Sequence, residues 1–112
     1  MEVKIYQIVE DLDEKRLVFS SLDAFKKAGY DELPAEIYKT VFSGHLDVES
    51  PEDLFVIFNT IYHKDFKGWS LSVSDVVEFQ YSAEKSEFYF CDSFGFEIVS
   101  FDKEKVFSSE EV

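Results

Sequence analysis

The residues best suited to holding a metal ion are two histidines, His45 and His63, and a single cysteine, Cys91. None of them falls in the short C-x2-C or H-x3-H spacings that are typical of zinc sites. A site built from His63, Cys91 and Asp92 is conceivable, but two surface histidines and a buried thiol explain the same residues, because a free cysteine usually behaves as a small hydrophobe. We therefore expect no metal site.

A second group with chemical potential consists of Ser70, Ser72, Ser74 and Asp75. A serine activated by a histidine and an aspartate is a common nucleophilic arrangement. However, the chain has no G-x-S-x-G turn, and nothing in the sequence brings either histidine to this group. The residues are better explained as satisfying backbone groups where a strand begins.

The remaining polar residues favour neither catalysis nor a cofactor. The chain has 24 carboxylates in 112 residues, so no catalytic pair can be singled out. Its four glycines are isolated from one another, and none belongs to a phosphate-binding loop. We expect no cofactor and no enzymatic activity, and a single cysteine allows no internal disulfide.

The charge of the chain restricts its partners. The formal net charge is −13, and Arg16 is the only arginine. Nucleic acids and anionic membranes are bound mainly through lysine and arginine clusters, so neither is an expected partner. The basic surface of another protein is the natural electrostatic partner, although the charge also serves to keep an aromatic-rich protein in solution.

Composition and length indicate one folded domain over residues 1–112. Hydrophobic residues make up 46% of the chain and aromatic residues 18%, which excludes intrinsic disorder and supplies one core. No signal peptide or membrane-spanning run is visible, so we expect a cytoplasmic protein. The charged end, residues 103–112, is expected to fray, and the oligomeric state cannot be read from the sequence.

The first half of the chain predicts strands and one short helix. β-Branched and aromatic residues predict a strand at 3–9 and another at 37–42, with a short strand at 16–19. Ser20 or Ser21 is expected to cap a helix that runs to Ala28 and ends at Gly29.

A second helix is predicted from the segment Ser50-Pro51-Glu52-Asp53 to about Tyr62. Ser50 suits the N-cap, Pro51 the first helical position and Asp53 the reach-back position of a capping box. The apolar spacing predicts a core-facing stripe, and further apolar residues widen it, so we expect this helix to be well covered. The stripe is Leu54, Ile57, Phe58 and Ile61, and the widening residues are Phe55, Val56 and Tyr62.

Three consecutive strands are predicted at 75–81, 87–92 and 96–101, joined by short turns. They predict a C-terminal three-strand meander. Together with the earlier elements they indicate an α+β domain, an antiparallel sheet with two helices packed on one face.

Residues for binding a protein partner come from two groups. Tyrosine and tryptophan are enriched at interfaces because they bury a large area at low entropic cost, and exposed acids would face a basic partner. The aromatic candidates are Trp69, Tyr62, Tyr81 and Tyr89, and the acidic candidates are Asp47, Glu49, Glu52, Asp53, Glu78 and Glu97.

Several strings resemble a known family. They are LFVIFN at 54–59, DFKGWSLSVSDVV at 65–77 and FYFCDSFGF at 88–96, supported by residues 6–8 and 38–44. The chain resembles the YodL-like domain family over about residues 3–101, although Lys64 stands where that family commonly has proline. The resemblance implies bacterial mobile elements, such as phages, plasmids and conjugative elements of Firmicutes, and it implies no catalytic residues.

Two functions remain open at this point. The first is a non-catalytic acidic module that binds and modulates a host protein. The second is a nucleic-acid mimic that inhibits a host defence nuclease or another DNA- or RNA-binding protein, of an anti-restriction or anti-CRISPR type. A mimic needs carboxylates in rows, and the candidate rows are Asp11, Asp13 and Glu14; Asp47, Glu49, Glu52 and Asp53; and Glu78, Glu84, Glu87 and Glu97.

Overall fold

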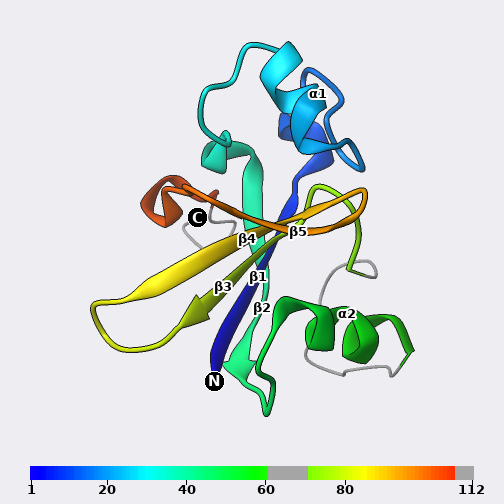
Figure 1. The fold of residues 1–112 in the computed structure, drawn as a ribbon. Helices are drawn as coiled ribbons and strands as arrows, with labels where there is room; N and C mark the ends of the chain where they lie inside the picture. The colour runs from blue at the N-terminus through cyan, green and yellow to red at the C-terminus, as the bar shows by residue number, and fades with distance from the viewer. Residues whose placement is uncertain (61–70, 108–112) are drawn as a thin grey trace.

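The computed structural model describes residues 1–60 and 71–107. Its centre is a five-stranded antiparallel sheet in the order β2-β1-β3-β4-β5 (Figure 1). The α+β class and the C-terminal meander are therefore confirmed. The strands are β1 Glu2–Ile8, β2 Tyr38–His45, β3 Val76–Gln80, β4 Ser86–Asp92 and β5 Gly95–Val99. The helices are α1 Leu22–Lys27 and α2 Pro51–Thr60. The 3-10 turns are η1 Glu10–Leu12, η2 Ala35–Ile37 and η3 Lys103–Lys105.

Local hydrogen bonds and turn residues set the start of both helices and the end of α1. The Ser21 side chain accepts a hydrogen bond from the backbone N–H of Ala24, and Gly29 adopts φ +100° just past α1, so both predicted caps are confirmed. At α2 the Asp53 carboxylate accepts hydrogen bonds from the backbone N–H groups of Glu49, at 3.0 Å, and Ser50, at 3.3 Å. Asp53 thus has the reach-back role predicted for it.

The two helices contribute to different parts of the core. Val76 and Val77 are neighbours on β3, so their side chains point to opposite faces of the sheet. Val77 packs in one cluster with residues of α2, Leu54 and Phe58. Val76 packs in the other cluster with Phe25 of α1. The two helices therefore pack on opposite faces of the sheet, whereas the sequence predicts both on one face.

No strand forms at 16–19, where one was predicted. The Asp13 carboxylate accepts hydrogen bonds from the backbone N–H groups of Leu17, at 2.8 Å, and Val18, at 2.9 Å. Arg16 and Phe19 have positive φ angles, 54° and 64°. These N–H groups are already bound to a side chain and the backbone is turned back on itself, so the segment cannot join a sheet ladder.

The β4–β5 turn is tied to the start of α1. Gly95 adopts φ +101°, a conformation that residues with a Cβ resist. The Asp92 carboxylate accepts hydrogen bonds from the backbone N–H groups of Ser93, at 2.8 Å, and Leu22, at 3.3 Å. The turn therefore has a defined position relative to α1.

The segment after β5 is anchored up to residue 107, which corrects the expected fraying from residue 103 onward. Lys103 forms an ion pair with Glu78 of β3 at 3.0 Å. The backbone N–H of Phe107 donates to the carbonyl of Tyr38 at 2.8 Å. The remaining part of the predicted frayed tail, residues 108–112, lies outside the described residues.

Candidate interaction groove

A groove of about 600 Å³ lies between α2 and the β4–β5 turn. Its walls come from three separate segments: α2, the stretch just before β3, and the β4–β5 hairpin. Most of its surface is apolar, and the apolar lining residues are Phe55, Val56, Leu71, Val73, Cys91 and Phe96. We call this feature the α2 groove.

Phe55 and Val56 face the groove because α2 uses a narrower stripe for the core than its sequence predicts. Leu54 and Phe58 are buried, whereas Phe55 is 43% exposed and Val56 is 60% exposed. The expectation that these two residues widen the core face of a well-covered helix is therefore wrong. Contiguous exposed apolar residues of this kind mark interaction sites more often than isolated ones do.

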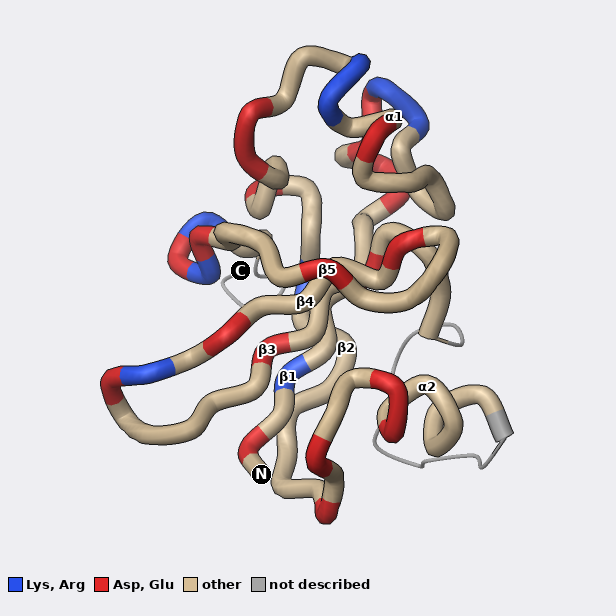
Figure 2. The backbone as a smooth tube through the Cα atoms, viewed as in Figure 1, with Lys and Arg blue, Asp and Glu red and all other residues tan. Residues whose placement is uncertain are grey.

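The charged residues that the structure describes at the groove are acidic. Glu52 and Asp92 line it, and no lysine or arginine is among its described lining residues. Asp47, Glu49 and Asp53, all exposed, lie just before or in the first turn of α2. Figure 2 shows these acidic segments beside α2, whereas α1 and η3 carry both signs of charge. The groove therefore suits an apolar group that carries or adjoins a positive charge.

Cys91 lies in the wall of the α2 groove, but it is not a reactive thiol. Its side chain is buried. Burial, followed by the negative charges of Asp75 and Asp92, raises the pKa of the Cys91 thiol to about 12. Because only the thiolate is a good nucleophile, the residue contributes shape rather than chemistry.

We expect Cys91 to react with 5,5′-dithiobis(2-nitrobenzoate) at pH 8 at least ~100-fold more slowly in the folded protein than in guanidinium chloride, because the raised pKa leaves little thiolate. The measurement is the absorbance of the released thionitrobenzoate, and the chain has no second cysteine to complicate it. Equal rates in the two states would show that the thiol is accessible and ionised.

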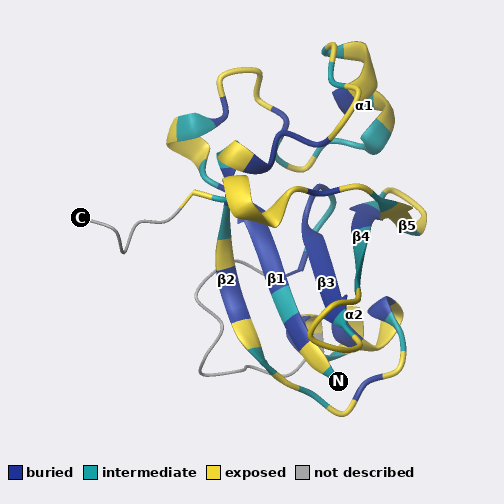
Figure 3. Ribbon diagram, turned by 90° about the vertical axis from the view of Figure 1, so that its left-hand side faces the viewer, coloured by how far each residue is buried: buried dark blue, intermediate teal, exposed yellow. Residues whose placement is uncertain are grey.

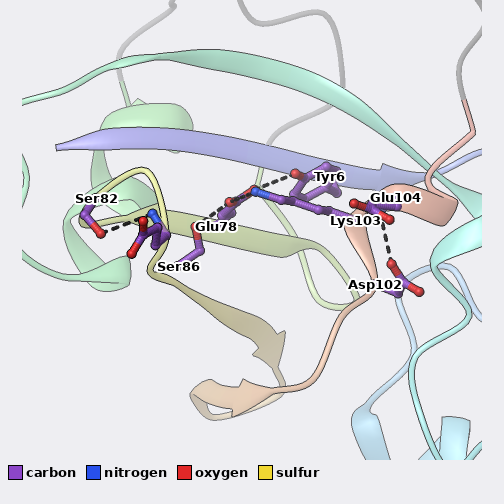
Figure 4. A network of polar contacts seen from close by, with 8 residues as sticks. Tyr6, Glu78, Ser82, Ser86, Asp102, Lys103 and Glu104 are labelled. Carbon is purple, nitrogen blue, oxygen red and sulfur yellow. Dashed lines mark hydrogen bonds and ion pairs between the residues drawn. The ribbon is translucent and has the colours of Figure 1, made fainter.

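Glu78, predicted to bind a partner from an exposed sheet face, is buried instead. Its side chain is 1% exposed. The hydroxyl of Tyr6 donates to Oε1 at 2.7 Å, the hydroxyl of Ser86 donates to Oε2 at 2.7 Å, and Nζ of Lys103 lies 3.0 Å from Oε2 (Figure 4). We call these four residues the Glu78 network. They remove Glu78 from the candidate interface.

The Glu78 network shifts the pKa values of Glu78 and Tyr6. Burial alone would raise the pKa of Glu78, but the hydrogen bonds from Ser86, Tyr6 and Lys103, together with the positive charge of Lys103, lower it below its ordinary value. Burial and the adjacent carboxylate raise the pKa of Tyr6 far above its usual range. Glu78 is thus a structural carboxylate that stays ionised at neutral pH.

The serine-rich segment before β3 also has a structural role, as predicted. The Asp75 carboxylate accepts hydrogen bonds from the Gln7 side chain at 2.9 Å and from the backbone N–H of Ser72 at 2.8 Å. The Ser74 hydroxyl accepts a hydrogen bond from the backbone N–H of Phe19 at 3.0 Å. His45 lies far from this segment in the sheet, at the end of β2, where it contacts Glu2 at 2.9 Å.

The aromatic candidates divide between exposed and anchored positions. Tyr81 is exposed but does not line the groove. Tyr89 is partly buried, and its hydroxyl donates to Glu87 at 3.1 Å; burial first, then hydrogen bonds with Tyr81 and Glu87, raise its pKa. Trp69 and Tyr62 lie outside the described residues, as do His63 and Ser70.

The acidic candidates are dispersed. Only Glu52 lines the groove, while Asp47, Glu49 and Asp53 are exposed nearby and Glu97 is exposed on β5.

The sequence does not predict Phe55, Val56 and Phe96 as site residues. The available signal was that Phe55 and Val56 fall outside the i, i+3, i+4, i+7 positions that bury Leu54 and Phe58.

Residues 1–60 and 71–107 contain neither a metal-binding cluster nor a membrane-spanning helix. No group of three or more histidine, cysteine, aspartate or glutamate residues there is arranged to hold a metal ion. No helix in the same residues has the length and apolar character needed to cross a membrane.

Comparison with protein families identifies a known domain. The sequence profile of the YodL-like domain matches residues 2–101. Searches of curated proteins and of solved structures found no significant match.

Proposed function

The chain belongs to the YodL-like domain family, and on that premise we propose that it is a non-catalytic module that binds a protein partner through the α2 groove. The observation that carries the proposal is the apolar groove of about 600 Å³, whose charged lining residues in the described part of the chain, Glu52 and Asp92, are both acidic. A buried apolar centre with a polar rim is the usual anatomy of a protein interface.

The net charge and the biological setting implied by the family resemblance narrow the class of partner. A net charge of −13 disfavours acidic partners and accelerates association with basic ones. The mobile-element setting implied by the resemblance makes a host protein the partner class, and we propose that binding modulates its activity in the bacterial cytoplasm. The partner presents an apolar side chain next to lysine or arginine.

The test is capture of partners from a bacterial lysate by the tagged protein and by its Val56→Asp variant. Val56 is 60% exposed, so the substitution leaves folding nearly unchanged. It places a charge in the lining of the groove, and we expect the affinity of the captured partner to fall at least ~30-fold, as for an interface hot spot. Mass spectrometry identifies the partner and calorimetry measures its Kd.

Tyr81→Ser is the matched control, since it removes an exposed aromatic residue that does not line the groove. We expect this variant to bind like the wild type. If Val56→Asp retained full affinity while circular dichroism showed it folded, the α2 groove would not be the binding site.

A nucleic-acid mimic is the second candidate, and one observation favours it. Asp47, Glu49, Glu52 and Asp53 are exposed within a stretch that contains no lysine or arginine. The burial of Asp13 and of Glu78 removes one member from each of the other two proposed rows, which is why we place the mimic second. If the captured partner is a nuclease that duplex DNA displaces and high salt releases, the mimic explains the result better than the groove does.

A further inference from the structure

The sheet has two edges, and they differ in how well they are protected. β2, at one edge, has a register irregularity where it pairs with β1 between Ile5 and Tyr6. Its exposed positions include Thr40, Ser43 and His45, all polar. Bulges and polar side chains are the usual means by which an edge strand is kept from pairing with another chain.

β5, at the other edge, has no register irregularity in its pairing with β4, and it exposes the apolar Ile98 beside the charged Glu97. It stands at the margin of the sheet farthest from β2 (Figure 3), and in the described part of the chain it pairs only with β4. Its pairing with β4 is regular from Phe96 to Val99. Ile98, in the middle of this run, is 69% exposed. An edge strand with exposed apolar side chains is a template for pairing with a further strand.

The side chains of β5 specify what such a strand should contain. Phe96 and Ile98 alternate with Glu97, so they point to the face of the sheet opposite to Glu97. Phe96 packs against the core cluster of α2 and lines the α2 groove. Glu97 is exposed on the other face. A strand paired with β5 would therefore place apolar residues toward Phe96 and Ile98, and a basic residue opposite Glu97.

We propose that the edge of β5 accepts an extended segment of the partner protein as a sixth strand, with lysine or arginine opposite Glu97 and apolar residues on either side of it. This inference rests on the proposed function and specifies how the partner binds. Because Phe96 belongs to both β5 and the groove, a strand on this edge has its apolar face directed toward the α2 groove. Main-chain hydrogen bonds supply affinity and the alternating side chains supply specificity.

A second copy of the chain is the less favourable occupant of the same edge. An antiparallel pairing of two β5 strands centred on Glu97 would bring two carboxylates opposite each other, which destabilises a strand pair. Each copy also carries a net charge of −13. Charge complementarity thus favours a basic segment over self-association.

The test uses two synthetic nonapeptides, Ser-Val-Thr-Val-Lys-Val-Thr-Val-Ser and the same peptide with glutamate in place of lysine. We expect the lysine peptide to bind the wild-type protein and to slow the hydrogen exchange of β5 amides, as measured by ¹⁵N NMR. Glu97→Lys should weaken the lysine peptide at least tenfold and strengthen the glutamate peptide. Glu84→Lys, which changes the net charge equally in the exposed β3–β4 turn, should have a much smaller effect.

A backbone control separates strand pairing from simple charge attraction. Methylating alternate amide nitrogens on one edge of the lysine peptide should abolish binding, and methylating those on the other edge should leave it intact, because only one edge faces β5. If both methylated peptides bind as well as the parent, no strand is added and the proposal fails.

Three other outcomes would contradict the proposed sixth strand. Exchange protection confined to residues 52–56 and 71–73 would place the peptide in the α2 groove alone, which overturns the sixth strand but leaves the proposed function standing. Absence of binding by either peptide overturns the edge proposal, while the Val56→Asp capture experiment continues to test the groove separately. Concentration-dependent dimerisation abolished by Ile98→Lys would assign the edge to a second copy of the chain instead.

Discussion

Replacing Glu78 with alanine is expected to lower the free energy of unfolding by about 3 kcal/mol, because it leaves several polar groups without their shared acceptor. The hydroxyls of Tyr6 and Ser86 both donate to this carboxylate, and Lys103 pairs with it. Lys103 is partly exposed and can turn to water, which keeps the loss below that of a fully buried ion pair. Urea unfolding followed by circular dichroism measures the change.

Two variants distinguish the Glu78 network from a general charge effect. Glu84→Ala removes an exposed carboxylate and should change the stability by less than about 0.5 kcal/mol. Glu78→Gln keeps the shape but loses the charge, and it should fall between the other two. A Glu78→Ala variant as stable as Glu84→Ala would contradict the role given to the network.

The same network predicts a pH dependence with a definite sign. The pKa of Glu78 is lowered in the folded protein from its ordinary value of 4.5. Its ionisation therefore stabilises the fold at pH values above about 4.5, and this contribution disappears as the pH falls through the lowered folded value. The difference in stability between the wild type and Glu78→Gln should shrink over that acidic range.

Replacing Asp75 with alanine is the second substitution with a large expected effect, again about 3 kcal/mol. Asp75 is fully buried just before β3, and its carboxylate accepts hydrogen bonds from Gln7 of β1 and from the backbone of Ser72. The loss of the carboxylate releases the loop from the sheet and leaves the Gln7 amide buried without this acceptor. Thermal unfolding should show a matching decrease in Tm.

Asp75→Asn is the matched control, because its side-chain oxygen can still accept one or both of these hydrogen bonds. We expect it to retain at least half of the stability lost in Asp75→Ala. If asparagine were as destabilising as alanine, the charge rather than the hydrogen-bond geometry would be the stabilising feature.

Local signals in the sequence were sufficient for most of the sheet, for the start of both helices and for the end of α1. Alternating apolar residues locate β3, β4 and β5, and the Ser50-Pro51-Glu52-Asp53 segment locates the start of α2. These features depend on neighbours within a few residues, which is why a pattern can find them. At 16–19 the apolar residues predict a strand, but the carboxylate of Asp13 binds the backbone N–H groups that a strand would need.

The site was less predictable because its residues come together only in three dimensions. The alternating strand predicts an exposed Glu78, since a charged residue in such a strand usually points to water. Its partners Tyr6 and Lys103 are 72 and 25 residues away. The α2 groove likewise joins residues of α2 with those beside β3 and β5, and no local pattern links them.

The position of β1 inside the sheet has a consequence for synthesis on the ribosome. β1 pairs with β2 on one side and with β3 on the other, and Glu2 lies opposite Gln80. A nascent chain can therefore form the β1–β2 pair once His45 has emerged, but the other edge of β1 stays open until β3 follows. At ordinary elongation rates this interval lasts roughly two to seven seconds, during which the apolar strand is available to chaperones or to neighbouring nascent chains.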